Sequence, residues 1–347
     1  MKIRPWPVHF RILTLLMATG VVGIAVIAAT RSGLIQNDDR QPENLQFTPP
    51  NWAYAVNPPA GTNNRKAESM DRSIRHVPNS DAAFRIEQTV DLFTVPDWHP
   101  DGHPEMPGIV AHGRKPEVFA CGYCHLPNGL GRPENSDLSG LPAAYIVQQM
   151  SDFKHGLRRT SVSGFLPAVS MAKYEALATD EEIEEAAKYF SGLKPKPWIR
   201  VVETDRVAKT HVAGWMLVVS EPKEMEPIGE RIVETPIDLE RTELRDDTSG
   251  FFAYVPVGSI ARGKALATTG AEGKTVTCGT CHGKELRGLA NVPRLAGRSP
   301  SYVVRQIVDM KNGVRTGAGA ALMKPVTANL DLQDIIAIAA YVASLNP

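Results

Sequence analysis

The feature that most constrains this chain is a five-residue pattern that occurs twice and uses every cysteine. The copies are Cys121-Gly-Tyr-Cys124-His125 and Cys278-Gly-Thr-Cys281-His282. On a helical turn, two cysteines three residues apart face the same way, so both sulfurs can form thioether bonds to the two vinyl groups of one porphyrin. The histidine that follows projects under the ring, where a ring nitrogen can bind iron. The pattern predicts two covalently bound haem c groups.

Other uses of paired cysteines fit this sequence poorly. A thioredoxin-like dithiol requires a βαβ setting, which the surrounding sequence does not indicate. A four-cysteine zinc site has its two C-x-x-C halves roughly 15–20 residues apart. Here 157 residues separate them. A chance match does not account for two copies that consume all four cysteines.

The sequence around the two copies is itself repeated. Residues 121–158 align with residues 278–315 without a gap, and 14 of the 38 aligned positions are identical. A duplicated domain is the economical explanation. Helical periodicity from Pro142 to about His155, a capping box at Thr179 and an apolar stretch at 331–345 predict helices in both copies. We therefore expect one helical domain at 108–197 and a second at 258–347.

Each repeat offers one methionine as a sixth iron ligand. Met171 lies 46 residues after His125, and Met323 lies 41 residues after His282. Both precede the tyrosine of the closing helix by eighteen residues, and both are expected in a loop before that helix. Met150 and Met310 instead occupy helical stripes and are interpreted as core residues. The predicted iron ligands are His125, Met171, His282 and Met323.

Two segments lie outside the repeats. Residues 31–107 are rich in Pro, Asn, Asp and Arg and predict an extended segment that wraps over a neighbouring domain, with one strand from Phe84 to Val95. Residues 198–257 predict a β-prone insert, with strands near 199–202, 212–219 and 231–234. His99, His103 and His112 stand just before the first motif. A hydrogen-bonding role is their default interpretation, with a metal site or a haem ligand as the alternative.

The N-terminal thirty residues predict export. Lys2, Arg4 and Arg11 precede an uncharged run from 12 to 30, and Arg31 closes it. Basic residues before an apolar run are typical of a signal sequence, and nineteen residues also approach the roughly 20 that span a bilayer. The leader is either cleaved or retained as an inner-membrane anchor. The expected location of the remainder is the periplasm.

Both repeats resemble class I cytochrome c domains, and their tandem arrangement resembles the two-domain dihaem cytochromes of bacterial periplasms. The resemblance rests on the two motifs, on the loop methionines and on Tyr302 and Gln306, and it covers about half of the chain. It implies that the carbonyl of Pro293 accepts a hydrogen bond from the ring of His282. Ser136 stands at the corresponding position of the first repeat, and the helix at 263–267 has no counterpart there. The implied fold is mainly α, with the insert between two cytochrome c domains.

The expected function is transfer of single electrons between a donor and an acceptor redox protein. Because Lys and Arg balance Asp and Glu at 38 each and no basic stripe is visible, nucleic-acid binding is not indicated. Two alternatives stay open: a cytochrome subunit of a periplasmic dehydrogenase or oxidase, and a dihaem peroxidase, which requires an iron that can lose its sixth ligand. The fifteen residues after each histidine carry a net charge of −1 in the first repeat and +2 in the second. This difference favours a lower potential for the first haem.

Overall fold

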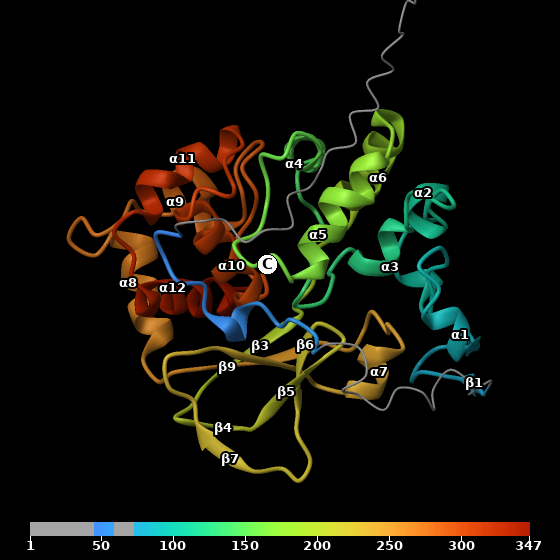
Figure 1. Ribbon diagram of the computed structural model, residues 1–347, viewed down its shortest axis with the longest axis horizontal. Helices are drawn as coiled ribbons and strands as arrows, with labels where there is room; N and C mark the ends of the chain where they lie inside the picture. The colour runs from blue at the N-terminus through green and yellow to red at the C-terminus, as the bar shows by residue number, and fades with distance from the viewer. Residues whose placement is uncertain (1–44, 59–72) are drawn as a thin grey trace, which may run out of the picture. The chain divides into compact units, whose positions relative to one another are not determined.

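The computed structural model describes residues 45–58 and 73–347 (Figure 1). The predicted leader, residues 1–30, lies outside the described residues. Within the described part, no single helix is long and apolar enough to cross a membrane. Two helices, Ala318–Thr327 and Leu332–Ser344, meet that criterion only as a pair bent by 119°. Helices hold 39% of the residues and strands 13%, so the mainly α prediction is confirmed.

The first repeat is a series of short helices. They are α2 (Gly108–Ala111), α3 (Cys121–His125), α4 (Ala143–Lys154), α5 (Leu166–Lys173) and α6 (Asp180–Gly192). Helix α4 begins directly after Pro142, and α6 begins at a capping box in which Thr179 and Glu182 each bond to the other's backbone N–H. Both helices were predicted. Their apolar faces, with Ile146 and Phe190, form one buried cluster.

The second repeat has the same order of helices from its motif onward, but where only the 4-residue α2 precedes the first motif, the 11-residue α8 precedes the second. Its helices are α8 (Ser259–Thr269), α9 (Gly279–His282), α10 (Pro300–Lys311), α11 (Ala318–Thr327) and α12 (Leu332–Ser344). Helix α12 starts at a capping box on Asp331, as the sequence indicated. Helices α8 and α12 cross so closely that a Cβ on Gly263 would lie 1.9 Å from the carbonyl oxygen of Ala337. Only glycine fits this crossing.

The insert is built from short strands. They are β3 (Ile199–Glu203), β4 (Arg206–Ala208), β5 (Thr210–Ala213), β6 (Met216–Val219), β7 (Met225–Pro227), β8 (Val233–Pro236) and β9 (Phe251–Val255), with helix α7 at Leu239–Glu243. Strand β9 pairs in parallel with β3 and antiparallel with β8, while β4–β7 and β5–β6 form separate hairpin-like pairs. The strands that the sequence predicted near 199–202, 212–219 and 231–234 are confirmed, although Gly214 and Trp215 interrupt the second with positive φ angles.

The N-terminal segment corrects one prediction. Phe84 to Val95 is not a strand: β2 covers only Phe84–Arg85, where it pairs with β1 (Ile74–Arg75), and helix α1 (Ile86–Thr89) follows at once. The reason is a capping interaction, because the side chain of Gln88 accepts a hydrogen bond from the backbone N–H of Arg85. Short 3-10 turns occur at Asn51–Ala53 and Pro100–Gly102.

The two described parts of this segment pack against neighbouring parts of the chain. The backbone of Phe47 exchanges hydrogen bonds of 2.8 and 2.9 Å with the side chain of Asn312 in the second repeat. Downstream, the backbone N–H of Ala120, just before the first motif, donates to the carbonyl of Leu92. Trp98 is buried against Leu244 of the insert. The described parts of the segment therefore contact the second repeat, the first repeat and the insert.

The repeats contact each other through equivalent residues. Arg158 Nη2 donates to the hydroxyl of Tyr302 at 3.0 Å, and its counterpart Arg315 Nη2 donates to the hydroxyl of Tyr145 at 3.2 Å. The two arginines also pair as an isolated antiparallel bridge. Each contact thus has its counterpart with the repeats exchanged, which is the signature of approximate two-fold symmetry.

One contact in this interface breaks the symmetry. Asp137 and Arg294 occupy the same position of the two repeats, 157 residues apart, and form a buried ion pair. Two hydrogen bonds from Ser139, at its N–H and its hydroxyl, hold the carboxylate of Asp137 at 2.9 and 2.7 Å. Opposite charges at equivalent positions let the repeats pair with each other, whereas two identical repeats would bring like charges together.

Candidate haem sites

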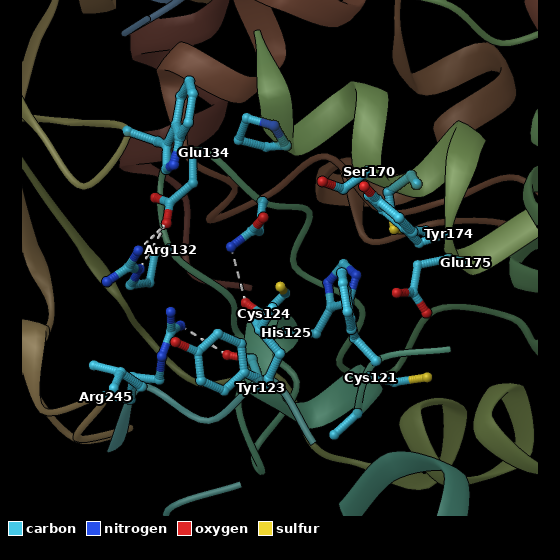
Figure 2. A pocket seen from close by; sticks show the side chains of 18 of the residues that line it. Cys121, Tyr123, Cys124, His125, Arg132, Glu134, Ser170, Tyr174, Glu175 and Arg245 are labelled. Carbon is cyan, nitrogen blue, oxygen red and sulfur yellow. Dashed lines mark hydrogen bonds and ion pairs between the residues drawn. The ribbon is translucent and has the colours of Figure 1, made fainter. Parts of the chain in front are cut away.

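The first motif opens into a large cavity. The cavity measures about 1070 Å³ and is lined by Cys121, Cys124 and His125 from helix α3. Figure 2 shows these side chains facing Ser170, Tyr174 and Glu175 across the space. Both sulfurs and the imidazole therefore reach one enclosed volume, as attachment of a single porphyrin requires.

Helix α5 supplies the opposite wall. Pro167, Ser170 and Met171 line the cavity at the three- and four-residue spacing of one helix face. Met171 is half-buried there and also lines a smaller adjoining cavity with His125. A second methionine, Met150 of α4, lines both cavities, which the sequence interpretation as a core residue did not foresee.

The expected loop position of both methionines is wrong. Met171 lies within α5, and Met323 lies within α11. Pro167 near the start of α5 suits a first helical turn, and the run Ala318 to Met323 is rich in residues that favour helix. Met171 and Met323 were preferred as iron ligands because they were expected in loops. Since both lie in helices, a loop position no longer distinguishes them from Met150 and Met310.

Both motif histidines are oriented by a backbone carbonyl. His125 Nδ1 lies 2.8 Å from the carbonyl oxygen of Ser136, and His282 Nδ1 lies 2.7 Å from that of Pro293. Donation from Nδ1–H leaves Nε2 with its lone pair, which is the form that binds a metal. The acceptor is backbone in both cases, so serine replaces proline without loss of the bond. Burial lowers the pKa of both histidines and keeps them neutral.

Burial keeps three of the four thiols protonated. Burial raises the pKa of Cys121 well above its ordinary value and raises those of Cys124 and Cys278 to about 11. A dithiol oxidoreductase or a thiolate metal site has lowered thiol pKa values instead. The environment of these cysteines therefore agrees with the haem interpretation and disagrees with the two alternatives.

The second motif lies closer to the surface. His282 is buried, Cys278 is half-buried and Cys281 is exposed. Helix α11 is held next to this motif, because the hydroxyl of Thr275 donates to the carbonyl of Val326 at 2.7 Å. The side chains of Leu289, seven residues after His282, and of Leu322 in helix α11 are 57% and 77% exposed. The second site is therefore the more accessible of the two.

The insert lines the first site. Residues 213–216 and 243–245 border the large cavity. Arg245 Nη1 donates to the carbonyl of Tyr123 inside the motif at 2.8 Å. The guanidinium carbon of Arg245 lies 3.5 Å from the centre of the Tyr123 ring. Arg132 pairs with Glu134 and donates to the carbonyl of Gly214. Sequence reasoning missed these residues, since no local pattern marks a contact 122 positions away.

The smaller cavity connects the first site to the interface between the repeats. It measures about 100 Å³ and runs along His125 and Met171 to Arg158 and Tyr302. Three nearby arginines, Arg158 among them, lower the pKa of the buried Tyr302 hydroxyl to about 7, against the effect of its burial. The interface thus holds buried positive charge beside the site.

The histidines before the first motif do not line either described cavity. His99 Nε2 contacts Asp246, and His103 contacts Asp97 and the hydroxyl of Tyr189. Their hydrogen-bonding role was the default prediction.

Comparison with known proteins agrees with the sites. A family model, cytochrome c, matches residues 260–346. Cytochrome c-554(548) of Halomonas halodenitrificans is 43% identical over 74 residues, which cover 21% of this chain and 89% of that protein. Cytochrome c4 of Azotobacter vinelandii is 25% identical over 235 residues, covering 66% of this chain and 86% of that protein.

A further relative is named for its redox role. The thiosulfate dehydrogenase electron acceptor of Stutzerimonas stutzeri is 33% identical over 84 residues, covering 24% of this chain and 38% of that protein. Covalently bound haem c is the cofactor that the shared motifs attach. The chain belongs to the cytochrome c family, and its function is electron transfer.

Proposed function

We propose that this chain is an exported dihaem cytochrome that passes single electrons between two redox proteins. One haem c is attached at Cys121 and Cys124 and the other at Cys278 and Cys281. His125 and Met171 would bind one haem iron, and His282 and Met323 would bind the other.

The proposal rests on which side chains line the opposite sides of the first cavity. Two sulfurs and a carbonyl-oriented imidazole lie on one side, and Met171 lies on the helix that forms the other. With one histidine and one methionine as ligands, a bound haem would supply one-electron chemistry without an open position for substrate.

The residues around the first site exclude water and balance charge. Arg132 and Glu134 are both buried and paired, so neither adds an uncompensated charge beside the iron. The insert closes the side of the cavity that carries Tyr123. Arg158 lines the passage from His125 to the repeat interface, where its guanidinium would hold a carboxylate of the bound group.

The second site is the one that meets partners. Cys281 is exposed and apolar side chains stand open beside it, whereas the insert and the N-terminal segment border the first site. Electron exchange with a soluble partner needs a short path from the haem edge to the surface. We therefore assign contact with the second redox protein to the face around Cys281 and Leu322.

Replacing each proposed sixth ligand tests the assignment. Met171→Ala and Met323→Ala should each convert one haem to a high-spin form that binds carbon monoxide and leave the other unchanged. Covalent attachment should survive, because the thioethers do not depend on the sixth ligand. Absorption spectra with and without carbon monoxide measure both effects.

Met150→Ala is the matched control, since Met150 lines the same cavity from α4. It should leave both haems low-spin. If Met150→Ala produces the high-spin haem and Met171→Ala does not, the ligand of the first site is Met150.

The location of the protein is also part of the proposal. The basic and apolar leader, residues 1–30, directs export to the periplasm, where the chain is either released or held at the inner membrane by residues 12–30. Intact mass separates the two: a mature chain that begins near residue 30 and is soluble after osmotic shock means cleavage.

A second candidate function is that of an electron-accepting subunit bound to a dehydrogenase. The insert favours it, because its two outer strand pairs, β4–β7 and β5–β6, are additions to the cytochrome c repeats. Mild detergent extraction of native membranes followed by affinity purification tests it. A large partner at equal stoichiometry supports the subunit, and a lone chain supports the free carrier.

A further inference from the structure

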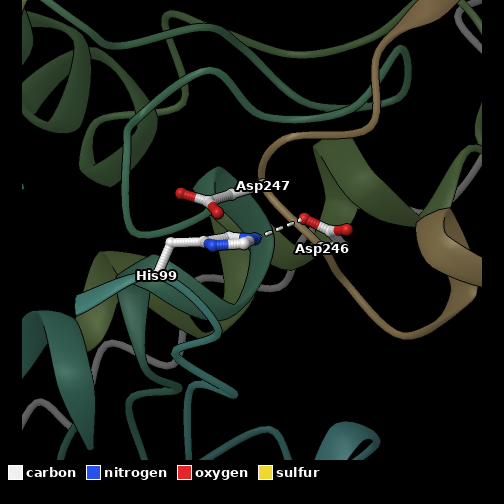
Figure 3. A group of neighbouring side chains, drawn as sticks. All are labelled: His99, Asp246 and Asp247. Carbon is white, nitrogen blue, oxygen red and sulfur yellow. Dashed lines mark hydrogen bonds and ion pairs between the residues drawn. The ribbon is translucent and has the colours of Figure 1, made fainter. Parts of the chain in front are cut away.

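A cluster of three side chains joins the N-terminal segment to the insert. His99, Asp246 and Asp247 each offer one ligand atom, and these atoms lie within 4.8 Å of one another (Figure 3). His99 Nε2 is 3.1 Å from Asp246 Oδ1. The side chain of Asp246 is fully buried, whereas that of His99 is 14% exposed and gives access from solvent. We propose that this cluster binds one divalent transition metal of the zinc class.

Asp247 points to a missing ligand. It is only 5% exposed, and its Oδ1 atom is buried without a hydrogen-bond partner. A buried carboxylate oxygen without a partner is costly, and a cation at the cluster would satisfy it. The backbone around it is held in place, because the side-chain amide of Asn128 donates to the carbonyl of Asp247 at 2.5 Å.

The charge around the cluster matches a dication. Asp97, Asp246 and Asp247 contribute three negative charges, and Arg241, whose Nε donates to Asp246 Oδ2 at 2.7 Å, contributes one positive charge. The remaining titratable neighbours are His99 and His103, the latter 3.2 Å from Asp97. The three carboxylates and the one arginine sum to −3 + 1 = −2, which one divalent ion offsets.

The donor atoms select the class of metal. One imidazole nitrogen and two carboxylate oxygens are ligands that Zn²⁺ accepts, with water in the fourth position. Calcium and magnesium ions prefer oxygen ligands throughout. Bonds of about 2.05 Å place neighbouring ligands of a tetrahedral ion roughly 3.3 Å apart. The pair His99 and Asp246, at 3.1 Å, already has that separation.

An ion here would fasten the insert to the first haem site. Asp246 and Asp247 directly follow Leu244 and Arg245, which line the large cavity. Arg245 in turn bonds to the carbonyl of Tyr123 inside the motif. Metal binding should therefore stabilise the closed arrangement of the insert over this cavity.

Zinc titration of the chelator-treated, haem-loaded protein tests the proposal. Equilibrium dialysis with elemental analysis should find one Zn²⁺ per chain. His99→Gln and Asp247→Asn should each weaken that binding at least ~10-fold. Zinc at about 100 times the dissociation constant of the wild type should raise the Tm of the wild type by roughly 5 °C and that of either variant by at most about half as much.

His211→Gln is the matched control, because His211 is an exposed histidine of the insert. It should bind zinc like the wild type. Equal zinc binding by the wild type, His99→Gln and Asp247→Asn would mean an adventitious ion only and overturn the site. Equal affinity for Ca²⁺ would overturn the class of metal. If Asp247→Asn loses its haem spectra, the result for His99→Gln decides.

Discussion

The buried ion pair between equivalent positions of the two repeats makes a quantitative prediction. The side chains of Arg294 and Asp137 are 4% and 8% exposed, so removing one partner leaves the other charge buried without its counter-ion. Such a loss costs about 3–5 kcal/mol. After Arg294→Met, Asp137 keeps two hydrogen bonds from Ser139, which places the cost near ~3 kcal/mol.

Removing both charges should cost little more than removing one. Asp137→Asn and Arg294→Met should each lower the free energy of unfolding by about 3 kcal/mol, and the double variant by a similar amount, since it contains no unpaired buried charge. The coupling energy is then about 3 kcal/mol. Each single change should lower Tm by roughly 6–12 °C.

Urea and thermal unfolding followed by circular dichroism measure these energies, with haem content matched between samples. Lys209→Met is the control, because Lys209 and Glu224 form a pair that is 50% and 58% exposed. It should cost less than ~1 kcal/mol. If the single effects simply add in the double variant, the two charges are not coupled, and the reasoning about the interface fails.

Two further predictions concern the helix crossing and the buried acid. Gly263→Ala should destabilise the second repeat by at least ~1–3 kcal/mol in urea unfolding, because the new Cβ would lie 1.9 Å from the carbonyl oxygen of Ala337. Gly192→Ala is the control: its Cβ would enter open space, so it should change stability by less than ~0.5 kcal/mol. Burial raises the pKa of Asp247 to about 6, above its value in the unfolded chain. With chelator present, the free energy of unfolding of the wild type should therefore fall as pH rises from 4 to 7. Asp247→Asn should flatten this dependence on pH, and an unchanged slope would contradict the prediction.

Local patterns predicted the helices that carry their own start signals. Pro142 precedes α4, and capping boxes at Thr179 and Asp331 begin α6 and α12. The two motifs likewise predicted the attachment residues, since cysteine spacing needs no tertiary information. The secondary structure of the segments that carry Met171 and Met323 was harder to predict, because a methionine can reach iron from either a helix or a loop.

Contacts distant in sequence could not be predicted. Charge counts after each histidine treated Asp137 and Arg294 as separate charges, but the structure pairs them. The first net charge then becomes −1 + 1 = 0 and the second +2 − 1 = +1, so the difference falls from three charges to one. One charge roughly 10 Å from iron at an effective dielectric of about 40 is worth ~0.8 kcal/mol, or ~35 mV. We expect a correspondingly small separation of the two potentials from these residues.

The central claim is that each repeat carries its own covalently bound haem. Intact mass and haem absorption, measured on the wild type and on variants with serine for Cys121 and Cys124 or for Cys278 and Cys281, test it most directly. We expect two haems per wild-type chain and one haem in either variant. A wild type with a single haem, or a variant of the first pair with unchanged haem content, would contradict it.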